Sequence, residues 1–158
     1  MRRTKGFSLI ELLIVVAIIL IIAAIAVPSF LRSRMAANES AAVASIRTLN
    51  TAQISYSSAY PTVGYAGALG DLAGTSCAPP SSSGACLIDT ALAGGVKNGY
   101  SFTLTNVTGT PNSTYNVIGA PVLPNYSGVH YFCSYADSVI RASMTTIATC
   151  DNAISPQQ

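Results

Sequence analysis

The chain has 158 residues and a formal net charge of +2, with 50% hydrophobic but only 9% charged residues. This length fits about one domain at roughly 150 residues per domain, which argues against a multidomain enzyme. Typical soluble domains carry about 25% charged residues, so the composition also argues against an ordinary cytosolic protein. Residues 48–158 hold only two Lys or Arg side chains, which is too few for strong electrostatic binding to a phosphate backbone. No nucleic-acid partner is therefore expected.

The N-terminus combines a short basic segment, residues 1–6, with an apolar run over residues 7–27. Ser8 and Glu11 are the two polar residues of that run. As a helix the run would be about 31 Å long, close to the hydrocarbon thickness of a bilayer. The sequence therefore predicts a membrane-spanning first half of a helix, with only a slight charge bias toward a cytoplasmic N-terminus.

The helical pattern continues beyond Pro28 as an amphipathic second half over residues 29–58. Four apolar residues are spaced seven apart and a fifth lies beside them, and residues 29–59 contain no Gly or Pro. These residues are Met35, Ala42, Leu49, Tyr56 and Ile46. We expect one helix from Phe7 to Ser58, which Pro28 should kink or locally weaken because proline removes a backbone hydrogen bond.

Residues 59–158 differ in composition from this helix and are predicted to form a globular head. From Tyr60 onward the chain holds seven of its eight prolines and eleven of its twelve glycines, which predicts frequent turns. The segment up to Gly95 should be rich in loops, with short helical turns at 69–73 and 87–92.

The C-terminal part of the head is predicted to form an antiparallel sheet. Four segments rich in β-branched and aromatic residues indicate strands, at 100–107, 114–123, 129–136 and 138–144. Tyr100, Phe102 and Leu104 alternate along the first strand and should share one face. The predicted class is α+β, a long N-terminal helix packed on an antiparallel sheet.

Residues 5–15, KGFSLIELLIV, resemble the start of a type IV prepilin. They are similar to the K-G-F-(S/T)-L-(I/V)-E signature shared by type IV pilins and the pseudopilins of type II secretion. The resemblance is close over about the first 30 residues, while the rest matches only in architecture. It implies that residues 1–6 are a leader, that a prepilin peptidase cuts after Gly6, and that Phe7 then becomes N-methylated.

The same resemblance implies an assembly route and a location. Subunits would reside in the inner membrane with a periplasmic head and would be extracted by pilus assembly machinery. They would then pack through their N-terminal helices into a homopolymer, an extracellular filament. For Pro28, the family suggests a helix segment that unwinds during assembly, beside the simpler reading of a kink.

Glu11 is the residue most strongly expected to act in assembly. A charged side chain at membrane depth costs a few kcal/mol on insertion scales, which makes it a functional candidate. Cleavage after Gly6 would create an α-ammonium group on Phe7, four residues before Glu11. In a filament the carboxylate could reach a neighbour's terminus and fix the axial register. The alternative is an acid tolerated near the membrane interface.

The four cysteines are even in number and form no CxxC motif, which indicates disulfides outside the cytosol. Three pairings are possible, and we expect the local one, Cys77 with Cys86 and Cys133 with Cys150. The second pair also matches the position of a bond in the heads of some family members, whereas the first pair departs from that pattern. No metal or catalytic role is expected for these thiols.

Nothing in the sequence supports an enzyme or a cofactor. His130 has no titratable partner at an informative spacing, and no run of oxygen ligands resembles an EF-hand, although calcium binding stays open. The expected function is a structural subunit of a type IV pilus that serves adhesion, motility or a related surface task. The alternatives are a type II secretion pseudopilin and a secreted protein cleaved at a signal-peptide site, Ala24-Ile25-Ala26.

Overall fold

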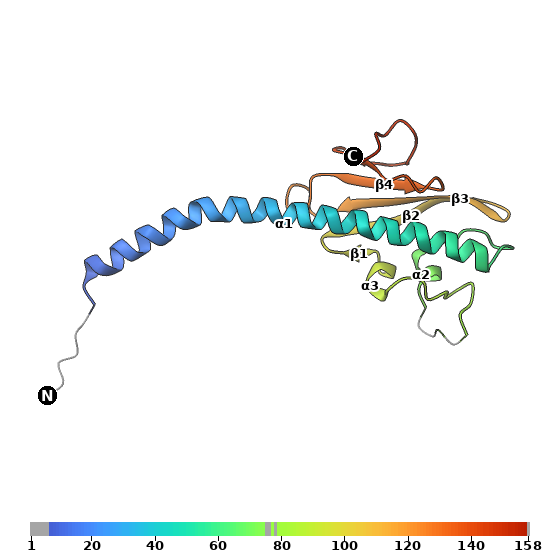
Figure 1. Cartoon of the computed structure of the whole chain (residues 1–158), viewed down its shortest axis with the longest axis horizontal. Coiled ribbons are helices and arrows are strands. Elements are labelled where there is room, and N and C mark those ends of the chain that lie inside the picture. The colour runs from blue at the N-terminus through green and yellow to red at the C-terminus, as the bar shows by residue number, and fades with distance from the viewer. Residues whose placement is uncertain (1–6, 75–76, 78, 158) are drawn as a thin grey trace. The chain divides into compact units, whose positions relative to one another are not determined.

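The computed structural model describes residues 7–74, 77 and 79–157. The chain divides into two compact units, residues 1–34 and 35–158 (Figure 1). Its helices and strands, in chain order, are α1 (Leu9–Ala59), α2 (Leu69–Leu72), α3 (Thr90–Ala93), β1 (Val96–Lys97), β2 (Tyr100–Gly109), β3 (Asn112–Pro121), β4 (Tyr131–Tyr135) and β5 (Arg141–Ser143). The predicted α+β class, a long helix and an antiparallel sheet, is confirmed.

Helix α1 begins and ends within two residues of its predicted bounds. Its last turn closes with a hydrogen bond from the Tyr60 N–H to the Tyr56 carbonyl, 2.9 Å long. The next residue is Pro61, which disfavours helical geometry at Tyr60 and so ends the helix. Pro28 lies inside α1 with helical residues on both sides, and its missing N–H leaves the Ala24 carbonyl without its usual donor.

The apolar stripe of α1 supplies one side of the core of the head. Ile46 and Leu49 are completely buried, and Ala42 and Tyr56 are nearly so, whereas Met35 is only partly buried. Their cluster includes large side chains from three strands, namely Tyr100, Phe102, Tyr115, Val117 and Phe132. Burial of a Leu or Ile side chain stabilises a fold by about 1.5–3 kcal/mol, so this face holds the helix on the sheet.

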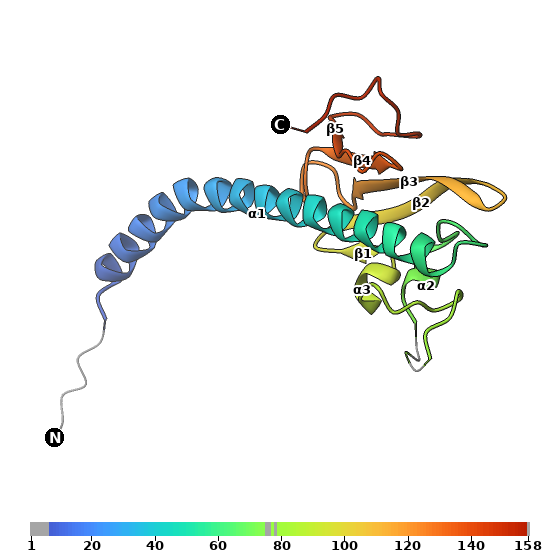
Figure 2. The ribbon, with the colours of Figure 1, turned by 45° about the vertical axis from the view of Figure 1, so that its right-hand side comes forward.

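The sheet has five antiparallel strands in the order β1-β2-β3-β4-β5, so each strand lies beside its neighbour in sequence (Figure 2). Phe102 of β2 lies opposite Gly119 of β3. A Cβ atom on Gly119 would lie 3.2 Å from Ile46 Cδ1 and 3.3 Å from the Phe102 ring, so glycine permits the close approach of helix and sheet.

The outer strands differ in length from the predictions. Strand β4 covers five residues and β5 only three, against the longer predicted segments 129–136 and 138–144. Strand β1, two residues long, was not predicted. On β2 the expected face is present, with Tyr100 and Phe102 buried, but Leu104 is only partly buried.

The two faces of the sheet have different coverings. Paired residues Ile118 and Cys133 belong to a second core cluster with Ile147 and Cys150 from the C-terminal segment. On the helix side, buried Asn50 donates to Ser134 Oγ at 2.8 Å. Buried β3 residues 115–119 reflect this covering on both faces, which explains why the strand lacks an alternating polar pattern.

Candidate functional site

Residues 7–31 display a long apolar surface. Phe7 is 90% exposed and Ile25 is 72% exposed, and an 18-residue window of α1 with a mean hydropathy of 3.3 is not buried at all. By length and composition this segment could cross a membrane, a property that signal sequences share. An apolar surface of this extent requires lipid or other protein surfaces to cover it.

Glu11 has a local hydrogen-bond partner at the start of α1. Its Oε2 atom accepts a hydrogen bond from the Ser8 backbone N–H at 2.9 Å. Ser8 directly precedes the first helical residue, Leu9, so Glu11 occupies the third helical position and makes half of a capping box. The sequence pattern S-x-x-E at residues 8–11 is the signal for this cap, and the sequence analysis missed it.

The predicted cleavage point lies at the edge of the described residues. Phe7 is described, whereas Gly6 and the rest of the predicted leader lie outside them. In the intact chain the Phe7 nitrogen is part of a peptide bond with Gly6, so it carries no charge. The carboxylate of Glu11 therefore has a helix-capping contact before any cleavage could supply a cationic partner.

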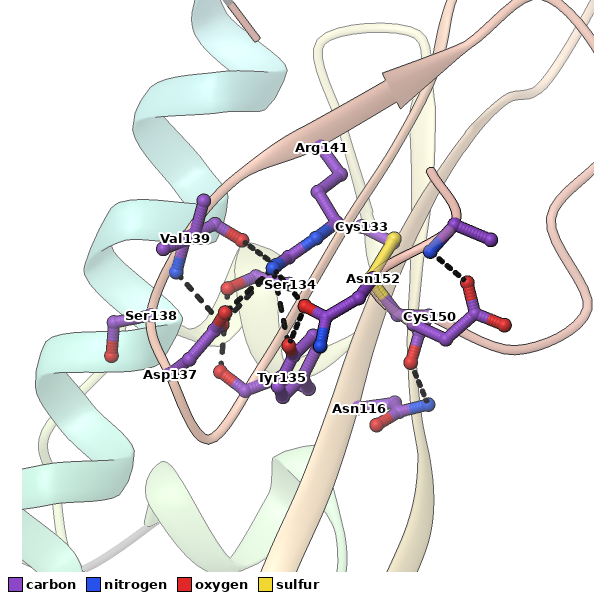
Figure 3. Close-up of a disulfide and its surroundings, with 12 residues drawn as sticks. Asn116, Cys133, Ser134, Tyr135, Asp137, Ser138, Val139, Arg141, Cys150 and Asn152 are labelled. Atoms are coloured by element: carbon purple, nitrogen blue, oxygen red, sulfur yellow. Dashed lines mark hydrogen bonds and ion pairs between the residues drawn. A yellow bond between two sulfur atoms is a disulfide. The ribbon is translucent and has the colours of Figure 1, made fainter. Parts of the chain in front are cut away.

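The structure contains both of the local disulfides, Cys77–Cys86 and Cys133–Cys150. The first closes a loop between α2 and α3, and the Cys86 N–H also donates to the Ala73 carbonyl at 2.7 Å. The second joins β4 to the C-terminal segment (Figure 3). Both bonds thus cross-link segments of the head that contain little regular secondary structure.

Arg141 forms a network of polar contacts beside the Cys133–Cys150 bond (Figure 3). Its side chain is only 6% exposed, and Nη2 donates to Asp137 Oδ2 at 2.7 Å and to Asn152 Oδ1 at 3.0 Å. The guanidinium also lies over the Tyr135 ring, 4.4 Å from its centroid. This arrangement ties the C-terminal segment to β4 and β5 through a paired, largely buried charge.

The Arg141 contacts also change the titration of Asp137. Partial burial favours the neutral carboxyl, but hydrogen bonds from Arg141 and from the Val139 N–H outweigh it and hold the pKa of Asp137 below its usual value of 3.8. Asp137 and Arg141 carry opposite charges and lie only four residues apart in the sequence. The sequence analysis did not predict an ion pair between these two residues.

His130 and Glu39 form a hydrogen-bonded pair between α1 and the residues before β4. Glu39 Oε1 accepts from the Val129 and His130 N–H groups at 2.7 and 3.1 Å, and Oε2 lies 2.9 Å from His130 Nδ1. Burial favours the neutral acid, but these contacts outweigh it and lower the pKa of Glu39 below 4.5. His130 therefore has a packing partner that sequence spacing could not reveal, 91 positions away.

Among the described residues, no group of three or more His, Cys, Asp or Glu side chains is arranged to hold a metal ion. The side chain of His130 contacts a carboxylate, but no serine or cysteine nucleophile joins that pair in the contacts of the described chain. The predicted site residues therefore lie in two places: Phe7, Glu11 and Pro28 in the N-terminal unit, and the cysteines in the head.

Comparison with known proteins matches the start of the chain to a family model and finds pilins that are similar to part of the chain. Residues 1–27 match the family model of the prokaryotic N-terminal methylation motif. The chain is 50% identical over 54 residues to the type IV major pilin protein PilA of Myxococcus xanthus. It is 54% identical over 44 residues to the type IV wide pilus major component PilA4 of Thermus thermophilus.

These alignments leave most of each protein unmatched. They cover 34% of this chain and 24% of the Myxococcus protein, and 28% of this chain and 34% of the Thermus protein. No solved structure matches the chain. The family model covers the predicted leader and most of the apolar segment that the structure leaves uncovered. The matched N-terminal motif and the similarity to two major pilins support a relationship to type IV pilins.

Proposed function

We propose that the protein is a structural subunit of a type IV pilus, polymerised through the apolar first half of α1. The observation that carries this proposal is the uncovered apolar surface of residues 7–31, interrupted by a single acid, Glu11. Packing such helices side by side removes their apolar surface from water. Two relatives of the chain are named as major pilus components.

The charge on Glu11 gives the polymer a register. Before processing, Glu11 caps its own helix through Ser8. A peptidase cut between Gly6 and Phe7 supplies an α-ammonium group at the end of each subunit, and methylation of Phe7 leaves that group cationic. In the apolar centre of a filament, each carboxylate pairs with the terminus of a neighbour, because an unpaired charge there is expensive.

Before assembly, the same segment holds the subunit in the inner membrane with its head in the periplasm. A periplasmic head agrees with four cysteines that are all paired, because disulfides persist in oxidising compartments. The partners in this scheme are prepilin peptidase, the assembly machinery and further copies of the chain. The protein is a structural component and not an enzyme.

A second candidate function is a pseudopilin of type II secretion. The N-terminal signature is common to both kinds of subunit, so the apolar segment and Glu11 serve either assembly. The two functions differ in where the polymer is found, outside the cell for a pilus and within the envelope for a pseudopilus.

Electron microscopy of filaments sheared from cells, followed by mass spectrometry of their subunit, tests the proposal. We expect extracellular filaments that consist of this chain, beginning at N-methylated Phe7. A chain that begins after the Ala24-Ile25-Ala26 site would instead show a signal peptide and contradict the pilin function. Correct processing without extracellular filaments, combined with a protein-export defect on deletion, would favour the pseudopilin.

A further inference from the structure

The connection between β3 and β4 is an exposed apolar turn, which we name the 122–126 turn. Its side chains Val122, Leu123 and Tyr126 are 49%, 62% and 71% exposed. No charged residue occurs from position 121 to position 129. Three exposed apolar side chains within five residues, without a charge among them, indicate a surface that meets a partner.

The 122–126 turn is held in a defined shape although its side chains are uncovered. The Tyr126 N–H donates to the Leu123 carbonyl at 3.0 Å, and the Asn125 N–H donates to the Gly128 carbonyl at 2.9 Å. A Cβ atom on Gly128 would lie 2.1 Å from the Tyr100 hydroxyl, so a glycine is needed where the turn packs on the head. The apolar side chains are thus presented on a rigid support.

Two polar contacts join the connection between β3 and β4 to α1, shortly after residue 34. Asn38 Nδ2 donates to the Ser127 carbonyl at 2.9 Å, and Glu39 accepts from the Val129 N–H at 2.7 Å. Asn38 lies only four residues after Arg34, so their Cα atoms stay within about 14 Å of each other in any backbone conformation. Chain connectivity therefore keeps the support of the turn close to the end of the apolar segment.

The residues at that end have the composition of a membrane boundary. Phe30 and Leu31 are followed by Arg32 and Arg34, both exposed. Arginine side chains that flank a spanning helix reach the lipid phosphates, so they place the membrane surface near position 34. A Tyr with neighbouring Leu and Val is the composition that suits the boundary between headgroups and acyl chains.

We propose that the 122–126 turn is a membrane contact of the unassembled subunit, with Leu123 and Tyr126 inserted at the lipid interface. This inference rests on the proposed function, because it requires the apolar segment of α1 to span a bilayer. Leu123 enters the acyl boundary, while the Tyr126 hydroxyl stays among the headgroups. The head then touches the bilayer at a second point besides its helix, and the contact is released when the subunit leaves the membrane.

Tryptophan fluorescence tests this contact, because the chain contains no tryptophan. The full chain with Tyr126→Trp is reconstituted into vesicles of phosphatidylcholine and phosphatidylglycerol, with and without brominated acyl chains. Bromine quenches only tryptophan that reaches it. We expect the brominated vesicles to remove about half or more of the Trp emission, because an interfacial side chain lies at the acyl boundary.

Two further single-tryptophan variants serve as controls. Ile18→Trp lies in the apolar segment and must be quenched if that segment spans the bilayer. Ile54→Trp replaces a half-exposed residue of the head, about 24 Å along α1 from Asn38, and should not be quenched. A variant that adds Leu123→Asn to Tyr126→Trp should lose most of the quenching, whereas Val63→Asn in the same background should not change it.

The outcomes separate the inference from the proposed function. Unquenched Ile18→Trp would contradict the membrane span, and with it the proposed function. Quenched Ile18→Trp with unquenched Tyr126→Trp would overturn the inference alone. Equal quenching at positions 54 and 126 would also overturn it, because the contact would not be specific to the turn. Emission at position 126 that shifts with protein concentration, but not with bromine, would assign the turn to a second copy of the chain.

Discussion

The two halves of α1 have the same backbone structure but opposite surroundings. The half from 9 to 34 carries almost continuous apolar side chains up to residue 27 and buries essentially none of them, whereas the half from 35 to 59 buries one stripe against the sheet. The second half is therefore held by the core of the head. The first half has no such support in the described chain and depends on lipid or on other helices. The proposed function in assembly would use this uncovered apolar surface.

The largest expected effect concerns the charge in the uncovered half. Glu11→Ala should abolish or severely reduce filament yield while leaving the abundance of the subunit in the membrane unchanged or higher. Removing one partner of a buried ion pair costs about 3–5 kcal/mol, and the loss would recur at every subunit contact. Sheared filament yield, leader removal and membrane-fraction abundance measure the effect.

Glu11→Gln is the matched control for this prediction. Glutamine can make the same helix cap through Ser8, so this variant removes the charge while retaining the hydrogen bond seen in the structure. We expect it to lose filaments as Glu11→Ala does. Normal filament yield for Glu11→Gln would show that Glu11 acts as a helix cap and not as a charged partner.

Leucine truncation in each half tests the comparison directly. Leu49→Ala removes a completely buried side chain and should lower the free energy of unfolding of the head by about 2–5 kcal/mol. Leu13→Ala removes a side chain that is 61% exposed and should leave that free energy unchanged. Denaturant titrations of the detergent-solubilised chain, followed by tyrosine fluorescence, measure both. Equal losses would mean that the first half is also part of the folded core.

The two disulfides should stabilise the head by different amounts. Replacing both Cys133 and Cys150 with alanine should lower the free energy of unfolding of the head by about 3 kcal/mol. This is the value expected for a loop closed by a separation of 17 residues. The Cys77–Cys86 bond closes a separation of only nine residues. Its removal should therefore lower the free energy of unfolding by about 0.5 kcal/mol less than removal of the other bond. Thermal and denaturant unfolding of the two double variants gives the order, and a reversed order would contradict the loop-length explanation.

The smallest expected effect is the acid sensitivity of the helix-to-head contact. The pKa of Glu39 lies below its usual 4.5 in the folded head, so its stabilising effect is complete above pH 4.5. This contribution is lost as the pH falls through the lower, folded-state pKa. Glu39→Gln should lower the free energy of unfolding by about 1–2 kcal/mol near neutral pH. It should also weaken the loss of stability that the wild type shows as the pH falls, which we call the acid limb.

The acid limb should not vanish completely in Glu39→Gln, because Asp137 also has a lowered pKa through its contact with Arg141. Combining Glu39→Gln with Asp137→Asn should flatten it further. Stability curves measured from pH 7 to pH 3 provide the comparison. A wild-type acid limb in Glu39→Gln would show that this carboxylate does not stabilise the folded head.

Several elements were predictable because their signals are local. The long helix follows from its apolar period and from the lack of Gly and Pro over residues 29–59, and it ends at Ala59 beside Pro61. Strands β2 and β3 follow from their β-branched and aromatic residues. Strand β1 was missed because two residues between Gly95 and Asn98 are too short to show a pattern. Strand β5 is shorter than predicted, and the residues before it form the turn in which Asp137 meets Arg141.

The sequence by itself determined the N-terminal segment: its length, its apolar surface, its single acid and its resemblance to prepilins. Such features depend on neighbouring residues and on helix geometry, which short patterns encode. Only the tertiary structure decided which distant groups meet, such as Glu39 with His130, Asn50 with Ser134 and Asn38 with Ser127. These pairs are 84 to 91 positions apart, and their contact depends on how the whole sheet folds back onto the helix.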